Sequence, residues 1–301
     1  MPDLSIIIVT YNNADTIGRC LHSLLDTTDA AGTEIIIIDN DSPDNTVDVI
    51  NEVITRNTSE HAIRLIENSD NLYFAAGCNQ GLDAATGEYL VLLNPDTVSL
   101  PGTWSTLVGW YEAHPKAGVI GPRMLNETGG TVPSCREFPT VRTLLFETLL
   151  LPCVFSGHRQ FDHWRMGYFD HAQTRRVDQP MGACMLTRRD KYTDVGMLDE
   201  RFPMFFNDVD WCRRFQDSGY DNYFVSESQL VHVGGHSVRR RPLTMLWFSH
   251  RGFLAYLKKY TRGGWGNPVL WIAAVLLGLG WVARVAGVLL RRIGRKMRAN
   301  T

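Results

Sequence analysis

Short runs of Ile, Val and Leu alternate with longer amphipathic segments through the first hundred residues. The run at residues 4–9 is almost unbroken, which is typical of a strand buried on both faces. Other segments repeat apolar residues at helical spacing, as Ile17, Leu21 and Leu24 do. The predicted strands cover residues 4–9, 34–38, 63–66 and 89–93, and the predicted helices cover residues 14–25, 41–54 and 75–85. This alternation predicts right-handed crossovers and an α/β fold with a mostly parallel central sheet flanked by helices.

The second half of the chain has a less regular pattern. It predicts a helix at residues 103–111, a strand at residues 117–125 and a further strand within residues 177–190. This last strand carries small residues at Gly182 and Ala183, which would leave room for a ligand.

Two helix starts carry a capping pattern. Ser42 is expected to be an N-cap because Pro43 suits the first position of a helix. Asn207 or Asp208 can cap a later helix, in which Asp210 is expected to be solvated. Asp208 could therefore be only a cap or could carry chemistry, and the pattern leaves both interpretations open.

Polar clusters follow three of the predicted strands at the point where each strand ends. They are Thr10-Tyr11-Asn12, Asp39-Asn40-Asp41 and Asn94-Pro95-Asp96. Each cluster alone could be turn chemistry. Ligands of open parallel sheets, however, bind beyond the carboxyl ends of the strands, where all three clusters would meet. The convergence favours a ligand site that includes Asp96.

The sequence lacks the glycine-rich loops that usually bind phosphates. No G-x-G-x-x-G follows the first strand, and no G-x-x-x-x-G-K-[ST] occurs in the chain. A diphosphate would then need a divalent metal such as Mg²⁺ or Mn²⁺, which prefers oxygen ligands and needs only one or two protein carboxylates. Asp96 could begin such a site, and His232 could join it. A lone His is more often structural, and Gly234-Gly235 argues against one helix presenting both His232 and His236 to a metal.

Charge is divided unevenly along the chain. The net charge of the 301 residues is −2, but residues 228–301 contain no Asp or Glu and carry 13 of the 30 Lys and Arg. The six cysteines form no C-x-x-C pair, which fits a reducing cytoplasm better than a disulfide scaffold or a zinc ribbon. The start of the sequence has no basic segment or cleavage site of an export signal, so we expect a protein inside the cell.

The basic C-terminal part, residues 241–301, predicts a membrane-associated extension. Residues 243–260 predict an amphipathic helix, and residues 271–290 contain a single charge, Arg284. A basic stripe continues through Arg291, Arg295 and Arg298. The stripe favours a helix in the plane of an anionic membrane surface over a spanning helix, with a core or dimerisation helix as the alternative. No recognition module accompanies these charges, so we expect no nucleic acid partner.

The motifs together resemble glycosyltransferase family 2, and especially its bacterial rhamnosyltransferase-like branch. The resemblance covers residues 4–240 in the family's order. The matching runs are SIIIVTYNNADTIGRCLHSL, IIIIDNDSPDNT, ENSDNLYFAAGCNQGLDAATGEYLVLLNPDT, GMLDERFPMFFNDVDWCRR and VHVGGHS. It implies a Rossmann-like GT-A catalytic domain at residues 1–240, with a nucleotide-sugar half at 1–98 and an acceptor half at 99–240.

The resemblance also implies roles for individual residues. Asp208 matches the catalytic base, and Trp211 and Gly182 are expected near the acceptor. Asp96 matches a metal ligand, and His232 a position that can complete the metal site. The residues implied in donor binding are Thr10, Tyr11, Asp39, Asn40, Gly77, Asn79, Gly81, Asn94 and Asp96. Asn94 stands where many relatives have an acid, so it should contribute less charge.

The resemblance implies a metal-dependent, inverting glycosyltransferase, and the C-terminal extension predicts that it acts at the cytoplasmic face of the membrane. The best-matching reaction moves rhamnose from dTDP-rhamnose to a glycan or polyprenyl-diphosphate-linked acceptor in cell-surface glycan synthesis. Another hexose or galactofuranose is the first alternative. A nucleotidyltransferase is disfavoured because its glycine-rich phosphate loop is missing, and an inactive scaffold because Asp96 and Asp208 are both present.

Overall fold

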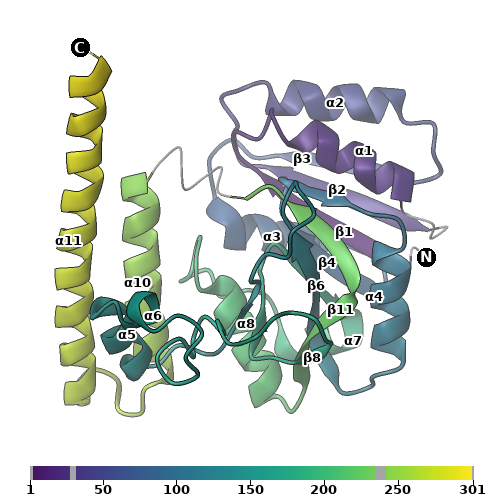
Figure 1. Ribbon diagram of the computed structural model, residues 1–301. Helices are drawn as coiled ribbons and strands as arrows, with labels where there is room; N and C mark the ends of the chain where they lie inside the picture. Colours follow the sequence, from purple (N-terminus) through teal and green to yellow (C-terminus); the bar gives the residue numbers. More distant parts are fainter. Residues whose placement is uncertain (1–2, 28–31, 235–241, 300–301) are drawn as a thin grey trace. The chain divides into compact units, whose positions relative to one another are not determined.

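The computed structural model describes residues 3–27, 32–234 and 242–299, with side chains up to residue 288 (Figure 1). It divides into two compact units. The first, here called the sheet unit, comprises residues 1–138, 169–203 and 207–234. The second, the helical unit, comprises residues 139–168, 204–206 and 235–301.

A mixed sheet forms the centre of the sheet unit, in the strand order β3-β2-β1-β4-β10-β6-β11-β5, with β8 paired to β11. Strands β1 to β4 are mutually parallel where they pair, whereas β10 runs antiparallel to both β4 and β6. A separate two-stranded sheet joins β7 and β9. The strands are β1 Leu4–Thr10, β2 Thr33–Asp39, β3 Ala62–Glu67, β4 Tyr89–Leu93, β5 Thr97–Ser99, β6 Ala117–Leu125, β7 Cys135–Arg136, β8 Arg175–Arg176, β9 Gln179–Pro180, β10 Cys184–Arg188 and β11 Asp221–His232.

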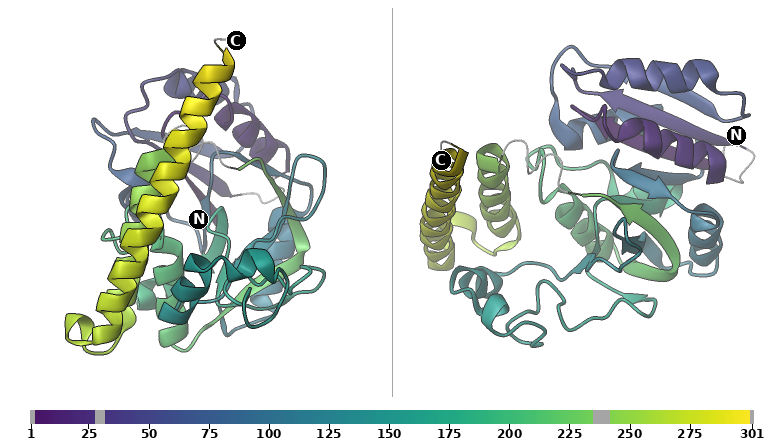
Figure 2. Two further views of the ribbon diagram at one scale, coloured as in Figure 1. Left: turned by 60° about the vertical axis from the view of Figure 1, so that its left-hand side comes forward. Right: turned by 45° about the horizontal axis from the view of Figure 1, so that its top comes forward.

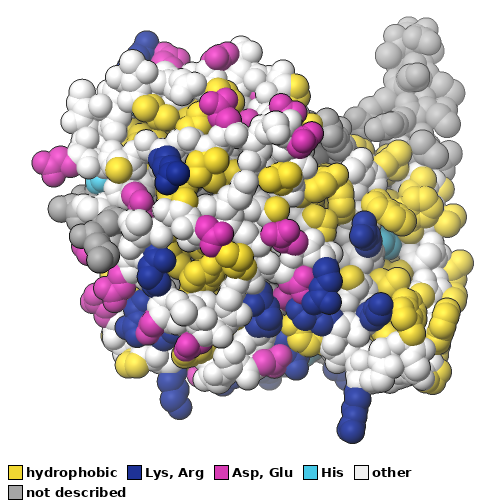
Figure 3. Space-filling model, turned by 180° about the vertical axis from the view of Figure 1, so that it is seen from behind, with side chains coloured by type: hydrophobic (Ala, Val, Ile, Leu, Met, Phe, Trp, Pro, Cys, Tyr) yellow, Lys and Arg dark blue, Asp and Glu magenta, His cyan; other side chains and the backbone are white. Residues whose placement is uncertain are grey.

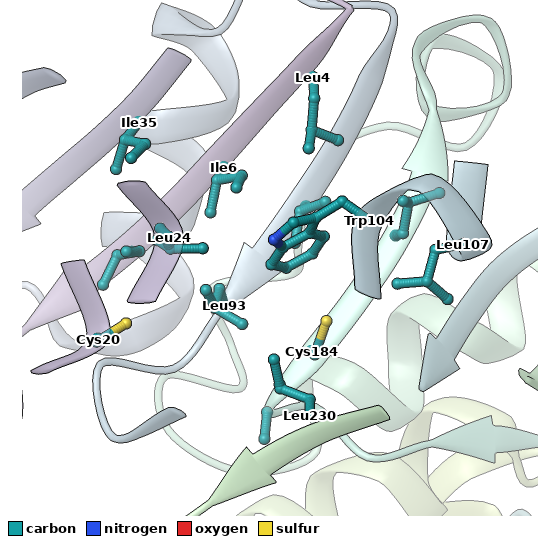
Figure 4. Close-up of a cluster of buried hydrophobic side chains, with 14 of the residues drawn as sticks. Leu4, Ile6, Cys20, Leu24, Ile35, Leu93, Trp104, Leu107, Cys184 and Leu230 are labelled. Atoms are coloured by element: carbon teal, nitrogen blue, oxygen red, sulfur yellow. The ribbon is translucent and has the colours of Figure 1, made fainter. Parts of the chain in front are cut away.

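Helices cover both faces of this sheet. Because successive strand side chains point to opposite faces, Ile6 and Ile8 pack with α1, α2 and α4, while Ile7 and Val9 pack with α3 and α8. Figure 4 shows the first of these clusters around Trp104. The helices are α1 Ile17–Thr27, α2 Thr46–Arg56, α3 Tyr73–Ala84, α4 Thr103–Glu112, α7 Arg189–Val195 and α8 Asn207–Asp217.

The structure confirms the α/β fold and the parallel pairing of the four N-terminal strands. The predicted cap at Ser42 is wrong, because α2 begins at Thr46 and the Ser42 hydroxyl donates to Asp39 instead. The strand expected within residues 177–190 is two pieces, β9 and β10. Gly182 and Ala183 lie in the turn between them rather than in a strand.

The helical unit consists of α5 Val141–Thr148, α6 Leu151–Val154, α10 Pro242–Tyr260, the short η1 Gly264–Gly266 and α11 Pro268–Ala299. Helix α11 packs along α10 and also contacts α5, and Figure 2 shows this arrangement. The expected boundary at residue 240 assigned residues 139–168 to the catalytic domain. Their contacts instead group them with the C-terminal helices.

The helical unit carries most of the exposed large hydrophobic side chains among the described residues, and Figure 3 shows such side chains gathered along α11. One set belongs to α5 and α6 and another to α11. They are Leu145, Leu149, Leu150, Val154, Phe155, Trp247, Trp265, Val269, Trp271, Ile272, Val275, Leu279 and Val282. Residues 268–288 are long and apolar enough to cross a bilayer, and only 17% of their most apolar window is buried in the protein. The side chains of Arg291, Arg295 and Arg298 lie outside the described residues, so the predicted basic stripe stays a prediction beyond Arg284.

Candidate active site

The ends of β1 and β2 meet through a carboxylate with several donors. Thr10 and Asp39 are register partners, and the Thr10 hydroxyl donates to Asp39 Oδ1 at 2.7 Å. Ser42 donates to the same carboxylate from its hydroxyl at 2.6 Å and from its backbone N–H at 2.8 Å. Asp39 is only 2% exposed, so burial requires such donors. Asp39 therefore holds the loops that follow β1 and β2 in fixed positions.

Asn40 extends this network toward α3. Its amide donates to the Tyr73 carbonyl at 3.0 Å and its side-chain oxygen accepts from Asn68 at 2.9 Å. The Asn40 backbone N–H donates to the Thr10 carbonyl at 3.0 Å. Tyr11, which follows β1 directly, remains partly exposed. The four residues expected around the nucleoside are thus gathered at one edge of the sheet, and their contact with a nucleoside stays a prediction.

The three expected donor-binding residues of α3 face the protein interior. A Cβ on Gly77 would lie 2.9 Å from Val9 Cγ1, and one on Gly81 would lie 2.2 Å from Ile7 Cγ2. Both glycines thus allow α3 to pack closely on β1. Asn79 donates to the Leu198 carbonyl and to Glu200, and accepts from the Leu198 N–H. Gly77, Asn79 and Gly81 therefore make their contacts inside the protein, where they stabilise the packing beneath the edge of the sheet.

The turn after β4 presents Asp96. The Asn94 N–H donates to the Ala183 carbonyl at 2.9 Å, and the Thr97 hydroxyl closes the turn on the Asn94 carbonyl at 2.8 Å. The Asp96 carbonyl accepts from the Val233 N–H at 3.0 Å. These backbone bonds fix Asp96 between the end of β4 and the end of β11.

Asp96 and His232 form a pair at this turn. His232 is the last residue of β11 and pairs in register with Thr97, which brings its Nε2 to 3.3 Å from Asp96 Oδ1. Two ligands at adjacent corners of an octahedral divalent cation would be about 3 Å apart, since two metal–ligand bonds of about 2.1 Å then meet at a right angle. The pair therefore fits two corners of such a site. Among the described residues no third His, Cys, Asp or Glu joins them, so donor phosphates and water would complete the coordination.

Asp208 lies in the first turn of α8 and is held from two sides. Its Oδ1 accepts from the Val209 N–H at 2.9 Å, and its Oδ2 accepts from Gln179 Nε2 at 2.5 Å. Burial raises the pKa of Asp208, whereas the hydrogen bonds from the backbone and Gln179 and the charge of Arg136 lower it, and burial wins. A carboxylate with a raised pKa is a stronger base than an ordinary aspartate.

The turn at Gly182 connects the two acids. A Cβ on Gly182 would lie only 2.7 Å from Asp208 Oδ2, so Gly182 and the carboxylate are in direct contact. The next residue, Ala183, accepts the Asn94 N–H of the Asp96 turn. Asp96 and Asp208 therefore approach the same loop between β9 and β10, although 112 positions of sequence separate them.

Two predictions about α8 are wrong. Trp211, expected near the acceptor, is 0% exposed and donates its indole N–H to the Gly196 carbonyl within the core. Asp210, expected in solvent, is also 0% exposed and forms an ion pair with Arg214 at 3.0 Å. Trp211 packs against Phe215 in the hydrophobic core, and Asp210 is buried in the first turn of α8 because Arg214 neutralises its charge.

Sequence reasoning did not identify Gln179. Gln179 lies in the two-residue strand β9, which pairs with β7. This pairing joins residues far apart in the chain, so no local sequence pattern predicts it. Gln179 is 6% exposed and its amide donates to Asp208. The only signal in the sequence was its place three residues before Gly182.

A family model described as "Glycosyl transferase family 2" matches residues 5–196. The chain belongs to glycosyltransferase family 2. It is 26% identical over 307 aligned residues to the N-acetylglucosaminyl-diphospho-decaprenol L-rhamnosyltransferase of Mycobacterium tuberculosis, covering 98% of this chain and 97% of that protein. It is also 26% identical to the low-salt glycan biosynthesis hexosyltransferase of Haloferax volcanii, covering 77% of this chain and 66% of that protein.

Among solved structures, the chain resembles a mannosyltransferase from Pyrobaculum calidifontis in complex with GDP-Man and Mn²⁺. The TM-score is 0.60 at 17% identity, and the match covers 98% of this chain and 80% of that one. This likeness shows the GT-A-like fold. As a family 2 member, the protein is a glycosyltransferase acting on nucleotide sugars.

Proposed function

We propose that the protein is a metal-dependent, inverting transferase that moves rhamnose from dTDP-rhamnose to a lipid-linked acceptor in cell-surface glycan synthesis. The observation that carries the reaction type is the meeting of the Asp96–His232 pair and Asp208 at one loop. The support for the sugar and acceptor is the similarity along almost the whole chain to a rhamnosyltransferase whose name specifies a diphospho-decaprenol acceptor.

The proposed reaction is a single in-line displacement. Asp208 takes the proton of the acceptor hydroxyl, whose oxygen attacks the anomeric carbon from the side opposite the departing diphosphate. Gln179 orients the Asp208 carboxylate through its amide, and Gly182 leaves space in front of it. Asp96 and His232 would hold a divalent cation such as Mg²⁺ or Mn²⁺. When bound, the cation stabilises the negative charge that develops on the leaving diphosphate.

The proposed site of action is the cytoplasmic face of the membrane. The apolar surface of α11 and of the α5–α6 segment supports contact with lipid, because monomeric soluble proteins rarely expose such extended apolar patches. Removing residues 263–301 should shift the protein from the membrane fraction toward the soluble fraction. A truncated protein that sediments with membranes as fully as the intact chain would contradict this part of the proposal.

The donor is tested by incubating the intact protein with separate nucleotide sugars, Mn²⁺ or Mg²⁺, and a polyprenyl-diphosphate N-acetylglucosamine acceptor, and measuring diphosphate release. dTDP-rhamnose should give the fastest acceptor-dependent release, and EDTA should abolish it. GDP-mannose and UDP-hexoses test the hexose alternative, which the Haloferax relative supports. Faster release from one of them would replace rhamnose while leaving the reaction type in place.

A further inference from the structure

A cavity of about 200 Å³ lies within the helical unit, among α5, α10 and α11. An apolar cavity of about 150 Å³ is large enough to bind benzene, so this one can admit a segment of a hydrocarbon chain. Its wall is mostly apolar, with a small group of polar side chains. The lining includes Glu147, Trp164, His250, Phe253, Gly280 and Arg284.

Arg284 contributes a positive charge to the lining of this cavity. It is an exposed residue that lines the cavity, and its Nη1 donates to His250 Nε2 at 3.4 Å. His250 Nδ1 donates to the Leu246 carbonyl at 2.9 Å, so His250 is a neutral acceptor toward Arg284. Burial, together with the charge of Arg284, lowers the pKa of His250 and keeps it neutral. Among the described residues no carboxylate forms an ion pair with Arg284.

The other charges of the cavity cancel. Glu147 is 7% exposed and accepts from Arg165 Nε at 2.8 Å and Nη2 at 2.5 Å. Arg165 does not itself line the cavity, but its bidentate pair neutralises Glu147, so Arg284 is the lining charge that no described residue of opposite sign neutralises. A single cation beside an apolar hollow complements a singly charged phosphodiester that carries a hydrocarbon chain. A diphosphate, with its higher negative charge, is matched less well.

The surface beside the cavity is apolar and suits contact with such a molecule. On α11, an exposed apolar stripe formed by Ile272, Val275, Leu279 and Val282 lies next to the face that lines the cavity. The indole N–H of Trp164, which also lines the cavity, is buried with no hydrogen-bond acceptor among the described residues. The cavity therefore has a mostly apolar lining that contains one positive charge and a buried donor without an acceptor, and one of its walls is a helix that also carries exposed apolar side chains.

We propose that this cavity binds one acyl chain of an anionic phospholipid of the bilayer, whose phosphate pairs with Arg284. The site is separate from the transferase chemistry and would fasten the helical unit to anionic membrane. It makes no use of the donor, so its test is independent of the proposed reaction.

The test is native mass spectrometry of the detergent-solubilised full-length protein titrated with phosphatidylglycerol or phosphatidylcholine. The intact protein should retain one phosphatidylglycerol in preference to phosphatidylcholine. Arg284→Gln should weaken retention of phosphatidylglycerol roughly ten-fold and remove the preference, since a hydrogen bond to a charged group is lost. Gly280→Phe should displace both lipids, because a side chain there projects into the cavity, with His250 Nε2 3.9 Å from the Cβ position.

Matched controls exist for both changes. Gly278 lies on the same helix with nothing within 4 Å of its Cβ position, so Gly278→Phe should bind lipid as the unmodified protein does. Arg251 is exposed on α10 and does not line the cavity, so Arg251→Gln should preserve the preference. Equal lipid retention in all four variants would overturn the proposal. Displacement of phosphatidylglycerol by stoichiometric polyprenyl diphosphate would also overturn it and would assign the cavity to the acceptor lipid. Arg284→Gln, which changes no packing in the apolar interior, keeps the test decisive if Gly280→Phe does not fold.

Discussion

Gly182→Ala should remove most of the activity although it adds only one methyl group. The new Cβ would lie 2.7 Å from Asp208 Oδ2 and 3.1 Å from Asp208 Cβ and Cγ. To restore an ordinary contact of about 3.4 Å, the carboxylate must retreat by about 0.7 Å, which strains its hydrogen bond to Gln179. Moving Gly182 instead would disturb Ala183, whose carbonyl holds the Asn94 N–H at 2.9 Å. Either relaxation displaces a group of the site.

The expected loss is about 10²-fold in kcat, the cost of misplacing a catalytic group by about 1 Å. Diphosphate release with saturating acceptor measures kcat, and calorimetry with the donor and Mn²⁺ should show donor affinity changed by less than about two-fold. Gly109→Ala is the matched control, because nothing lies within 4 Å of its Cβ position on α4. A Gly182→Ala enzyme with at least half of the original kcat would refute the close approach of Gly182 to the base.

Further changes separate the roles of the other site residues. Asp208→Asn should lower kcat by about 10² to 10⁴ while donor affinity is preserved, and retention of more than about a tenth of the activity would exclude it as the base. The same variant should melt at a higher temperature at neutral pH. Burial raises the folded-state pKa of Asp208, so its stabilising contribution is present only at low pH and is lost as pH rises through that pKa. The apparent pKa of the acidic limb in the pH profile of kcat/KM should lie above the usual range of an aspartate. Gln179→Ala should raise this apparent pKa further, because the ionised Asp208 carboxylate loses a hydrogen-bond donor. An unchanged apparent pKa would exclude this role of Gln179. Asp96→Ala should weaken metal-dependent donor binding as well as turnover, which calorimetry with and without Mn²⁺ measures.

The sequence predicted those parts of the fold whose pattern is local. The β-branched run at residues 4–9 needs neighbours on both faces wherever it lies, and strands that alternate with helices of that length pair in parallel. The polar ends of β1, β2 and β4 then meet by geometry alone. Asp210 and Trp211 were misplaced because their burial depends on long-range contacts. Arg214, which pairs with Asp210, is itself held by the carbonyls of Val195 and Met197.

The two acids in the first turn of α8 have different partners, which is why the proposed mechanism assigns the base to Asp208 and not to Asp210. Asp210 is fully buried and forms an ion pair with Arg214, so its negative charge is neutralised and its oxygens are not accessible from solvent. Asp208 is partly exposed, and its side-chain partner is the neutral amide of Gln179. A neutral donor orients a carboxylate without cancelling its charge, so Asp208 keeps the basicity that proton removal requires. In the proposed mechanism, pairing with the amide of Gln179 rather than with an arginine is therefore what leaves Asp208, and not Asp210, able to act on an acceptor hydroxyl.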